Sequence, residues 1–123
     1  MTPADVTREI LGGSATAVSI KTARTGFTQS QRVHHLAEGL GLEVVMGNQI
    51  DGQLGSVCTV AFGAAHRRTT VQAGELSNFL DMSDDLLTEP LRIVGGELTV
   101  RPGAGLGVEI DEEKLRRYRV DAS

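Results

Sequence analysis

Several residue types are scarce in this chain of 123 residues, and each scarcity excludes a class of structure. The single cysteine, Cys58, excludes an intrachain disulfide and is typical of the reducing cytoplasm, so we expect a cytoplasmic location and a small buried side chain here. Tryptophan is absent and aromatic residues make up 3%, which argues against a protein-binding face built on aromatic anchors. Neither an apolar run of about 18 residues nor a basic, apolar leader occurs, so we expect neither a membrane span nor an export signal.

The chain also lacks a stripe of basic residues. Its formal net charge is −4, and the pairs Arg67-Arg68 and Arg116-Arg117 are expected at solvated turn and helix positions. Nucleic acid and anionic membranes are therefore excluded as expected partners. Glycine, by contrast, is abundant at 15 residues, which suits tight turns between strands and helices.

The first two thirds of the sequence alternate between apolar strands and helices. Strands are predicted at 15–20, buried on both faces, at 42–46 and, more weakly, within 69–76. The helices between them are predicted from Thr28, as a cap, to about residue 40, and over 52–65, with a first helix opened by Thr2-Pro3-Ala4-Asp5. This order predicts an α/β fold with right-handed βαβ units and a parallel sheet, either open or closed into a barrel.

The last third has a different pattern. Residues 91–94 and 97–100 flank Gly95-Gly96 and predict a β-hairpin, and Asp111 predicts the start of a short final helix. Another short helix is predicted at 84–88. We therefore place a boundary near Pro90, with strand–helix units in 1–90 and a hairpin-and-helix extension in 91–123.

Polar side chains follow the carboxyl ends of the predicted strands: Lys21 after the first, residues 48–51 after the second, and 75–81 around the third. Ligands bind at this edge of parallel sheets, and a lysine and a carboxylate facing each other there can exchange protons with a substrate. Two alternatives remain open at this point: Lys21 is a solvated loop residue, and Asp51 caps the helix that begins at Gly52.

The three histidines do not predict a metal site. His34 and His35 are adjacent within a predicted helix, which points their side chains in different directions, and His66 follows a separate buried helix. We expect three surface or half-buried imidazoles and no metal ligands in this chain.

At this level of detail the sequence resembles the C-terminal third of muconate cycloisomerase-type enzymes, in the muconate lactonizing enzyme and mandelate racemase branch of the enolase superfamily. The segments that carry the resemblance span nearly the whole chain. In chain order they are 20–26 (Ile-Lys-Thr-Ala-Arg-Thr-Gly), 46–55 (Met-Gly-Asn-Gln-Ile-Asp-Gly-Gln-Leu-Gly), 86–90, 96–103 and 105–112, with Leu115 and Tyr118 after them.

The resemblance implies the C-terminal segment of a (β/α)7β TIM-type barrel, with a C-terminal β-hairpin extension that packs on a capping domain. It implies a divalent ion, usually magnesium, that stabilises an enolate beside a substrate carboxylate. Lys21 matches the lysine of the sixth strand, and Asp51 matches the acidic position after the seventh, where glutamate is usual. Asn48, Gln49 and Asn78 are the expected substrate-binding residues, Asn78-Phe79 replacing a more usual Gly-Pro.

The resemblance also implies an incomplete site. The metal-binding carboxylates and a Lys-x-Lys motif of this family lie on earlier strands, so no residue here is assigned to those roles. We expect a fragment or one half of a split enzyme, whose partner is the missing N-terminal half or an intact homologue, and whose substrate is a small carboxylate. Intact enzymes of this kind are expected to form homo-oligomers. The alternatives are a truncated inactive paralogue and a small α/β interaction module, and open sheet edges predict that the isolated chain associates.

Overall fold

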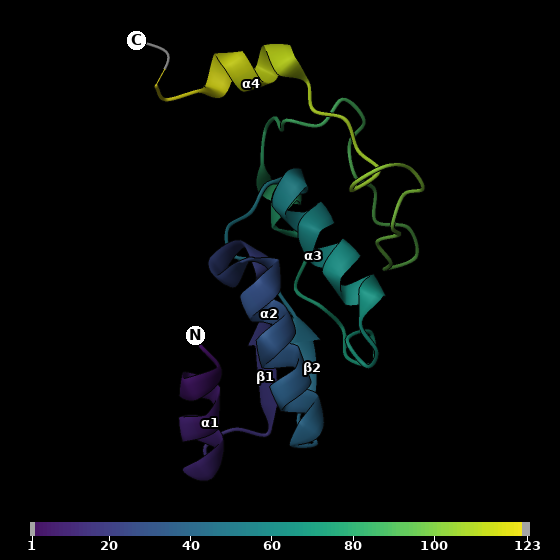
Figure 1. Cartoon of the computed structure of the whole chain (residues 1–123). Coiled ribbons are helices and arrows are strands. Elements are labelled where there is room, and N and C mark those ends of the chain that lie inside the picture. Colours follow the sequence, from purple (N-terminus) through teal and green to yellow (C-terminus); the bar gives the residue numbers. More distant parts are fainter. Residues whose placement is uncertain (1, 122–123) are drawn as a thin grey trace.

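The computed structural model describes residues 2–121, in which helices and two strands alternate over the first half and long loops follow. Figure 1 shows the early elements gathered around the strands, with the last helix at the far end of the molecule from the first. The elements, in chain order, are α1 (Pro3–Leu11), β1 (Ala17–Ile20), α2 (Thr22–Gly39), β2 (Glu43–Met46), α3 (Gln53–Ala65), the 3-10 helix η1 (Asn78–Asp81) and α4 (Glu112–Tyr118).

The two strands pair in parallel, as predicted, in a register that runs from Ala17 opposite Glu43 to Ile20 opposite Met46. The predicted third strand within 69–76 is wrong as a strand. Only Glu75 reaches β2, through a single parallel bridge to Gly47. The Glu75 N–H donates to the Met46 carbonyl at 3.0 Å. One bridge is still enough to place the chain after Glu75 beside the carboxyl end of β2.

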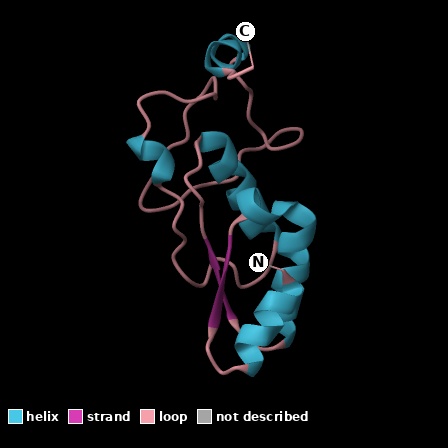
Figure 2. Ribbon diagram, turned by 90° about the vertical axis from the view of Figure 1, so that its left-hand side faces the viewer, coloured by secondary structure: helices cyan, strands magenta, loops and turns pink. Residues whose placement is uncertain are grey.

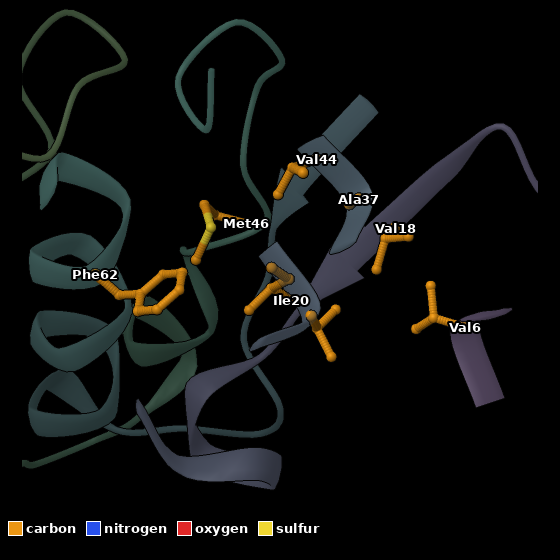
Figure 3. Packing of buried hydrophobic residues seen from close by; sticks show 8 residues of the cluster. Val6, Val18, Ile20, Ala37, Val44, Met46 and Phe62 are labelled. Carbon is orange, nitrogen blue, oxygen red and sulfur yellow. The ribbon is translucent and has the colours of Figure 1, made fainter. Parts of the chain in front are cut away.

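The prediction that the first strand is buried on both faces is also wrong. Val18 and Ile20 are buried, whereas Ala17 and Ser19 on the opposite face are exposed. Figure 2 shows the reason: the long helix lies on one side of the two strands, and extended loops follow on the other. The side chains of the covered face form the hydrophobic core, in which Phe62 of α3 points toward Met46 (Figure 3).

Local end signals place most helix boundaries where the sequence predicts them. Thr2 and Asp5 form a reciprocal capping box at the start of α1. Gly41 follows α2 with a φ of 71°, and the Asp111 carboxylate accepts from two backbone N–H groups of α4. α2 consists of two helical segments that meet at Gly26, whose φ of 69° and ψ of 169° are not helical. The helix predicted from Thr28 lies in the second segment, and the short segment from Thr22 to Thr25 was not predicted.

The C-terminal third has less regular structure than predicted. Gly95 and Gly96 both have positive φ and form a two-residue turn, closed by a bridge between Val94 and Glu97, but the flanking residues form no strands within 2–121. The helix predicted at 84–88 is absent from this described part. Residues 84–88 instead run as an extended loop, and Leu87 bridges to Ile110. The boundary near Pro90 stays a prediction.

The fold leaves an unusually large surface exposed. The accessible area is 8069 Å², whereas a compact monomer of 13.1 kDa exposes about 6,400 Å². Several large apolar side chains contribute, among them Ile50 and Val71. None of the helices in residues 2–121 combines the length and apolar composition needed to cross a bilayer.

Candidate functional site

Lys21 lies at the junction where β1 ends and α2 begins. Its backbone is extended, with φ −123° and ψ 102°, and its carbonyl accepts hydrogen bonds from the Arg24 N–H at 3.0 Å and the Thr25 hydroxyl at 3.3 Å. The side chain is half-buried. The first helical turn therefore fixes the main chain of Lys21 and leaves its side chain to project from the carboxyl edge of the sheet.

Gly47 makes room for that side chain. A Cβ atom built on Gly47 would lie 3.1 Å from Ser19 Oγ and 3.3 Å from Lys21 Cε. The aliphatic stem of Lys21 thus passes over the end of the neighbouring strand, at the one residue there without a side chain. Sequence reasoning missed this contact. The signal was a glycine directly after an apolar strand, which often marks a close approach.

Asn48 is the most buried of the predicted site residues, with 3% of its surface exposed. Its backbone N–H donates to the Glu75 carbonyl at 2.8 Å, and its side-chain Nδ2 donates to Ser56 Oγ of α3 at 2.6 Å. Within residues 2–121 its Oδ1 has no hydrogen-bond partner. A buried acceptor without a donor is costly, so this oxygen is suited to accept from a ligand. Gln49, beside it, is exposed.

Asp51 does not cap α3, so that alternative is wrong. Its Oδ2 accepts from the Gln49 N–H at 3.0 Å, which closes a turn within the loop. The cap comes from Asp85, whose Oδ2 accepts from the Gln53 N–H at 2.7 Å. Gly55 lies against Asp51, and a Cβ there would be 2.7 Å from the Asp51 Cβ. Asp51 is thus half-buried against the first turn of α3, but its carboxylate accepts no hydrogen bond from the N-terminus of that helix.

Asn78 opens η1 and is half-buried. Asn78 comes three residues after Glu75, which bridges to Gly47 at the end of β2. Lys21 follows β1, and Asn48 follows β2. The structure therefore places Lys21 and Asn48 at the same edge, with Asn78 three residues beyond the bridge at Glu75. In the described range no direct hydrogen bond joins Lys21, Asn48, Asp51 or Asn78 to one another.

A buried contact connects the helices that carry these residues. The hydroxyls of Thr22, directly after Lys21, and Thr59, in the middle of α3, are 2.7 Å apart and both residues are buried. Thr59 also donates to the Gly55 carbonyl at 3.2 Å. Cys58, its neighbour, is half-buried, and burial first and the charge of Asp51 second raise the pKa of its thiol. A raised pKa keeps the sulfur protonated and argues against a nucleophilic role.

The histidines contradict the sequence prediction. His34 is buried rather than half-exposed, and one ring nitrogen from each of His34, His35 and His66 lies within 4.8 Å of the other two. His66, at the C-terminal end of α3, lies beside both positions of α2, with its ring centroid 4.7 Å from that of His34 and 6.3 Å from that of His35. Periodicity within one helix carries no information about such a contact between two helices.

Magnesium does not fit the carboxyl edge of this chain by itself. Mg²⁺ requires oxygen ligands, chiefly carboxylates. In residues 2–121 the histidine group is the one set of three metal-ligating side chains that converges, and it is not at this edge. Asp51 is the carboxylate that follows β2, and it is a single ligand.

Comparison with known proteins places the whole arrangement in a family. The profile described as "Enolase C-terminal domain-like" matches residues 1–114. Muconate cycloisomerase 1-1 of Acinetobacter lwoffii is 34% identical over 89% of this chain and 28% of its own length. The o-succinylbenzoate synthase of Bacillus subtilis (strain 168) is 28% identical over 93% of this chain and 31% of its own.

Solved structures agree. A muconate lactonizing enzyme from Mucobacterium Smegmatis superposes with a TM-score of 0.94 at 75% identity, over 98% of this chain and 34% of that one. The chain spans about a third of the length of these relatives. Its α/β fold is that of the C-terminal domain of muconate lactonizing enzymes. The chain belongs to the enolase C-terminal domain-like family, and its relatives include muconate cycloisomerases.

Proposed function

We propose that the chain is the C-terminal part of a metal-dependent enzyme of the cycloisomerase and racemase type, in which Lys21 moves a proton at the carbon next to a substrate carboxylate. The position of Lys21 carries this proposal. Its side chain crosses Gly47 at the carboxyl edge of the sheet, where Asn48 follows β2. The relatives named as muconate cycloisomerases support the reaction class.

The proposed architecture is the last segment of a (β/α)7β barrel with a C-terminal extension. Parallel strands joined by a helix are the repeating unit of such a barrel. The exposed face of β1, with Ala17 and Ser19, would then line the barrel interior. The exposed surface in excess of a compact monomer supports this proposal, because a larger assembly would cover it.

The residues have separate proposed roles. A neutral Lys21 amine would accept the α-proton of the substrate, and its ammonium form would return a proton to the same carbon. Asp51, half-buried at the same edge, would act as the opposing polar or acidic group. The free Oδ1 of Asn48 would accept a hydrogen bond from a substrate donor, and Gln49 and Asn78 would complete the binding edge.

Magnesium is the proposed metal of the complete enzyme, where it would stabilise negative charge on the substrate carboxylate. Its ligands would come from a partner polypeptide, such as an N-terminal half or an intact homologue. No step assigned to the residues above requires an ion held by this chain. We further propose a cytoplasmic location, which the unpaired thiol of Cys58 supports.

Reconstitution tests the proposal. The chain is mixed with the N-terminal two thirds of a muconate cycloisomerase relative and magnesium. Exchange is followed as incorporation of deuterium from deuterated water at the carbon next to the carboxylate, with muconate and other small carboxylates. The sequence has two lysines, Lys21 and Lys114, which provides a matched pair of variants. We expect Lys21→Met to reduce exchange at least a hundredfold and Lys114→Met to retain it. Equal activity of the two variants would reject the role of Lys21.

A second candidate is an inactive packing module, and the lack of three converging carboxylates among residues 2–121 supports it. In the same experiment this candidate predicts that the two polypeptides form a complex without proton exchange. Complex formation, measured by sedimentation, therefore separates a module that binds without chemistry from one that supplies Lys21.

A further inference from the structure

We propose that His34, His35 and His66 form a binding site for a divalent transition-metal ion of the zinc, nickel or copper class, separate from the carboxyl edge of the sheet. One ring nitrogen from each residue lies within 4.8 Å of the other two. Three nitrogens around a tetrahedral ion, at bond lengths near 2.05 Å, are about 3.3 Å apart. The group therefore needs a contraction of about 1.5 Å at its widest separation, which small side-chain rotations provide.

Backbone carbonyls fix which nitrogens are available. His34 Nε2 is 3.1 Å from the Arg67 carbonyl, and His66 Nδ1 is 2.8 Å from the Phe62 carbonyl. A carbonyl only accepts, so each of these nitrogens carries the hydrogen. In the neutral rings His34 Nδ1 and His66 Nε2 then carry free lone pairs. This pattern, with one nitrogen donating to the protein and the other free, is the one that orients histidines toward metals.

The second observation is the buried nitrogen of His34. His34 is 3% exposed, and its Nδ1 has no hydrogen-bond partner within residues 2–121. Aromatic packing alone, such as the 4.1 Å stacking of Phe62 on His66, explains the position of the rings but leaves this nitrogen unpaired. An ion would satisfy it. The exposed His35 and half-buried His66 leave the site open to solvent, so water can complete the coordination.

The ligand set selects the class of ion. Three imidazoles without a carboxylate suit zinc, nickel and copper, and do not suit magnesium or calcium, which require oxygen ligands. The cations Arg67 and Arg68 follow His66 directly, and Arg68 has a φ of 67°, a conformation rare for a residue with a side chain. That turn presents the Arg67 carbonyl to His34.

The site lies far from the proposed chemistry. His66 follows the C-terminal end of α3, whereas Asp51 precedes its N-terminal end, and 13 residues of helix span about 20 Å. An ion there would join the second half of α2 to the end of α3. Its role would be structural, holding the two helices that carry Thr22 and Thr59.

Metal titration of the whole chain tests this inference. Zinc chloride, and separately copper(II) for electron paramagnetic resonance, is added to chelator-treated protein, and binding is followed by calorimetry and by the melting temperature. Because the sequence contains three histidines, every imidazole signal comes from this group. We expect one ion per chain, a rise in melting temperature and nitrogen hyperfine structure on copper.

Substitutions separate the site from adventitious binding. His35→Gln, at an exposed position, avoids the folding risk of replacing buried His34 and is expected to weaken binding at least tenfold. The exposed neighbour Arg32→Gln and the thiol variant Cys58→Ser are expected to retain it. The inference is overturned by the absence of saturable binding, by one ion per two chains, by binding that His35→Gln leaves unchanged, or by binding that Cys58→Ser removes.

Discussion

Asp85 caps a helix that begins 32 residues before it: its Oδ2 accepts from the Gln53 N–H at 2.7 Å, and α3 has no side-chain cap of its own at Gly52. Gly52 is required for this contact, since a Cβ there would lie 2.9 Å from the same carboxylate oxygen. This hydrogen bond connects the loop after η1 to the residues that follow β2. An anionic side chain at this helix N-terminus also interacts favourably with the positive end of the helix dipole.

Removing the Asp85 carboxylate tests the contribution of this hydrogen bond. We expect Asp85→Ala to lower the free energy of unfolding by about 1–2 kcal/mol, since a helix N–H loses its acceptor, and to lower the melting temperature by about 4–8 °C. The exposed Asp81→Ala in η1 is the matched control, with an expected change within about 0.5 kcal/mol. Equal effects of both substitutions, measured by urea and thermal unfolding, would contradict the assignment.

The attachment of α4 depends on pH at both extremes. Asp84 accepts from Lys114 Nζ at 2.6 Å and from the Tyr118 hydroxyl at 2.8 Å, and these bonds lower the pKa of Asp84 from 3.8 to about 2. The contribution of the Asp84 carboxylate to the stability of the folded chain is therefore complete above pH 3.8 and is lost as the pH falls toward 2. The same bonds raise the pKa of Lys114 and of Tyr118, so their contribution is complete below pH 10 and is lost as the pH rises above it.

Tyr118 reports this attachment directly, because the chain has one tyrosine and no tryptophan. We expect its absorbance titration to give a pKa above 10.0, and Asp84→Asn to move that pKa back toward the ordinary value. Asp81→Asn removes the same charge without the hydrogen bond and serves as the control. A tyrosine titration that Asp84→Asn leaves unchanged would show that α4 is not held in this way.

Gly47→Ala tests the position of Lys21 without removing its amine. The added Cβ would meet Ser19 Oγ at 3.1 Å and Lys21 Cε at 3.3 Å, so the lysine stem must shift. In the reconstituted assay we expect proton exchange to fall about tenfold, because small misplacements of a reacting group are costly. Gly39→Ala, whose Cβ would meet nothing within 4 Å, is the control and is expected to retain full exchange. Full activity of Gly47→Ala would mean that this contact does not position the lysine.

The isolated chain is expected to associate. Its exposed area exceeds that of a compact monomer, and Val71 and Leu80 are 73% and 63% exposed. Gel filtration and sedimentation should show mass rising with concentration, reduced by the pair Val71→Ser and Leu80→Ser and unaffected by Val120→Ser at the chain end. A dilute, stable monomer with a cooperative melt would count against this expectation.

Local signals in the sequence were sufficient for the boundaries that depend on nearby residues. Thr2 with Asp5, Gly41 and Asp111 act within four residues of themselves, so composition and spacing predict them. The parallel pairing of β1 and β2 also follows from the strand–helix–strand order.

The features that were predicted wrongly depend on contacts between distant segments. The Asp85 cap joins positions 32 apart, and His34 meets the Arg67 carbonyl across 33 positions. Neither contact changes the local spacing of apolar residues. The third strand is reduced to Glu75 because that residue is the one of the segment that bridges to β2, while residues 70–74 are exposed and pair with no strand in the described chain.

The buried pair of Thr22 and Thr59 has a consequence for how this segment tolerates sequence change. Thr22 adjoins Lys21, and Thr59 bonds to Gly55, which lies against Asp51. A substitution in the middle of α3 would therefore displace both candidate catalytic residues at once, although they are 30 positions apart. Substitutions at Thr59 would therefore be selected against as strongly as substitutions in the active site. This would hold although Thr59 lies inside a helix and away from any substrate.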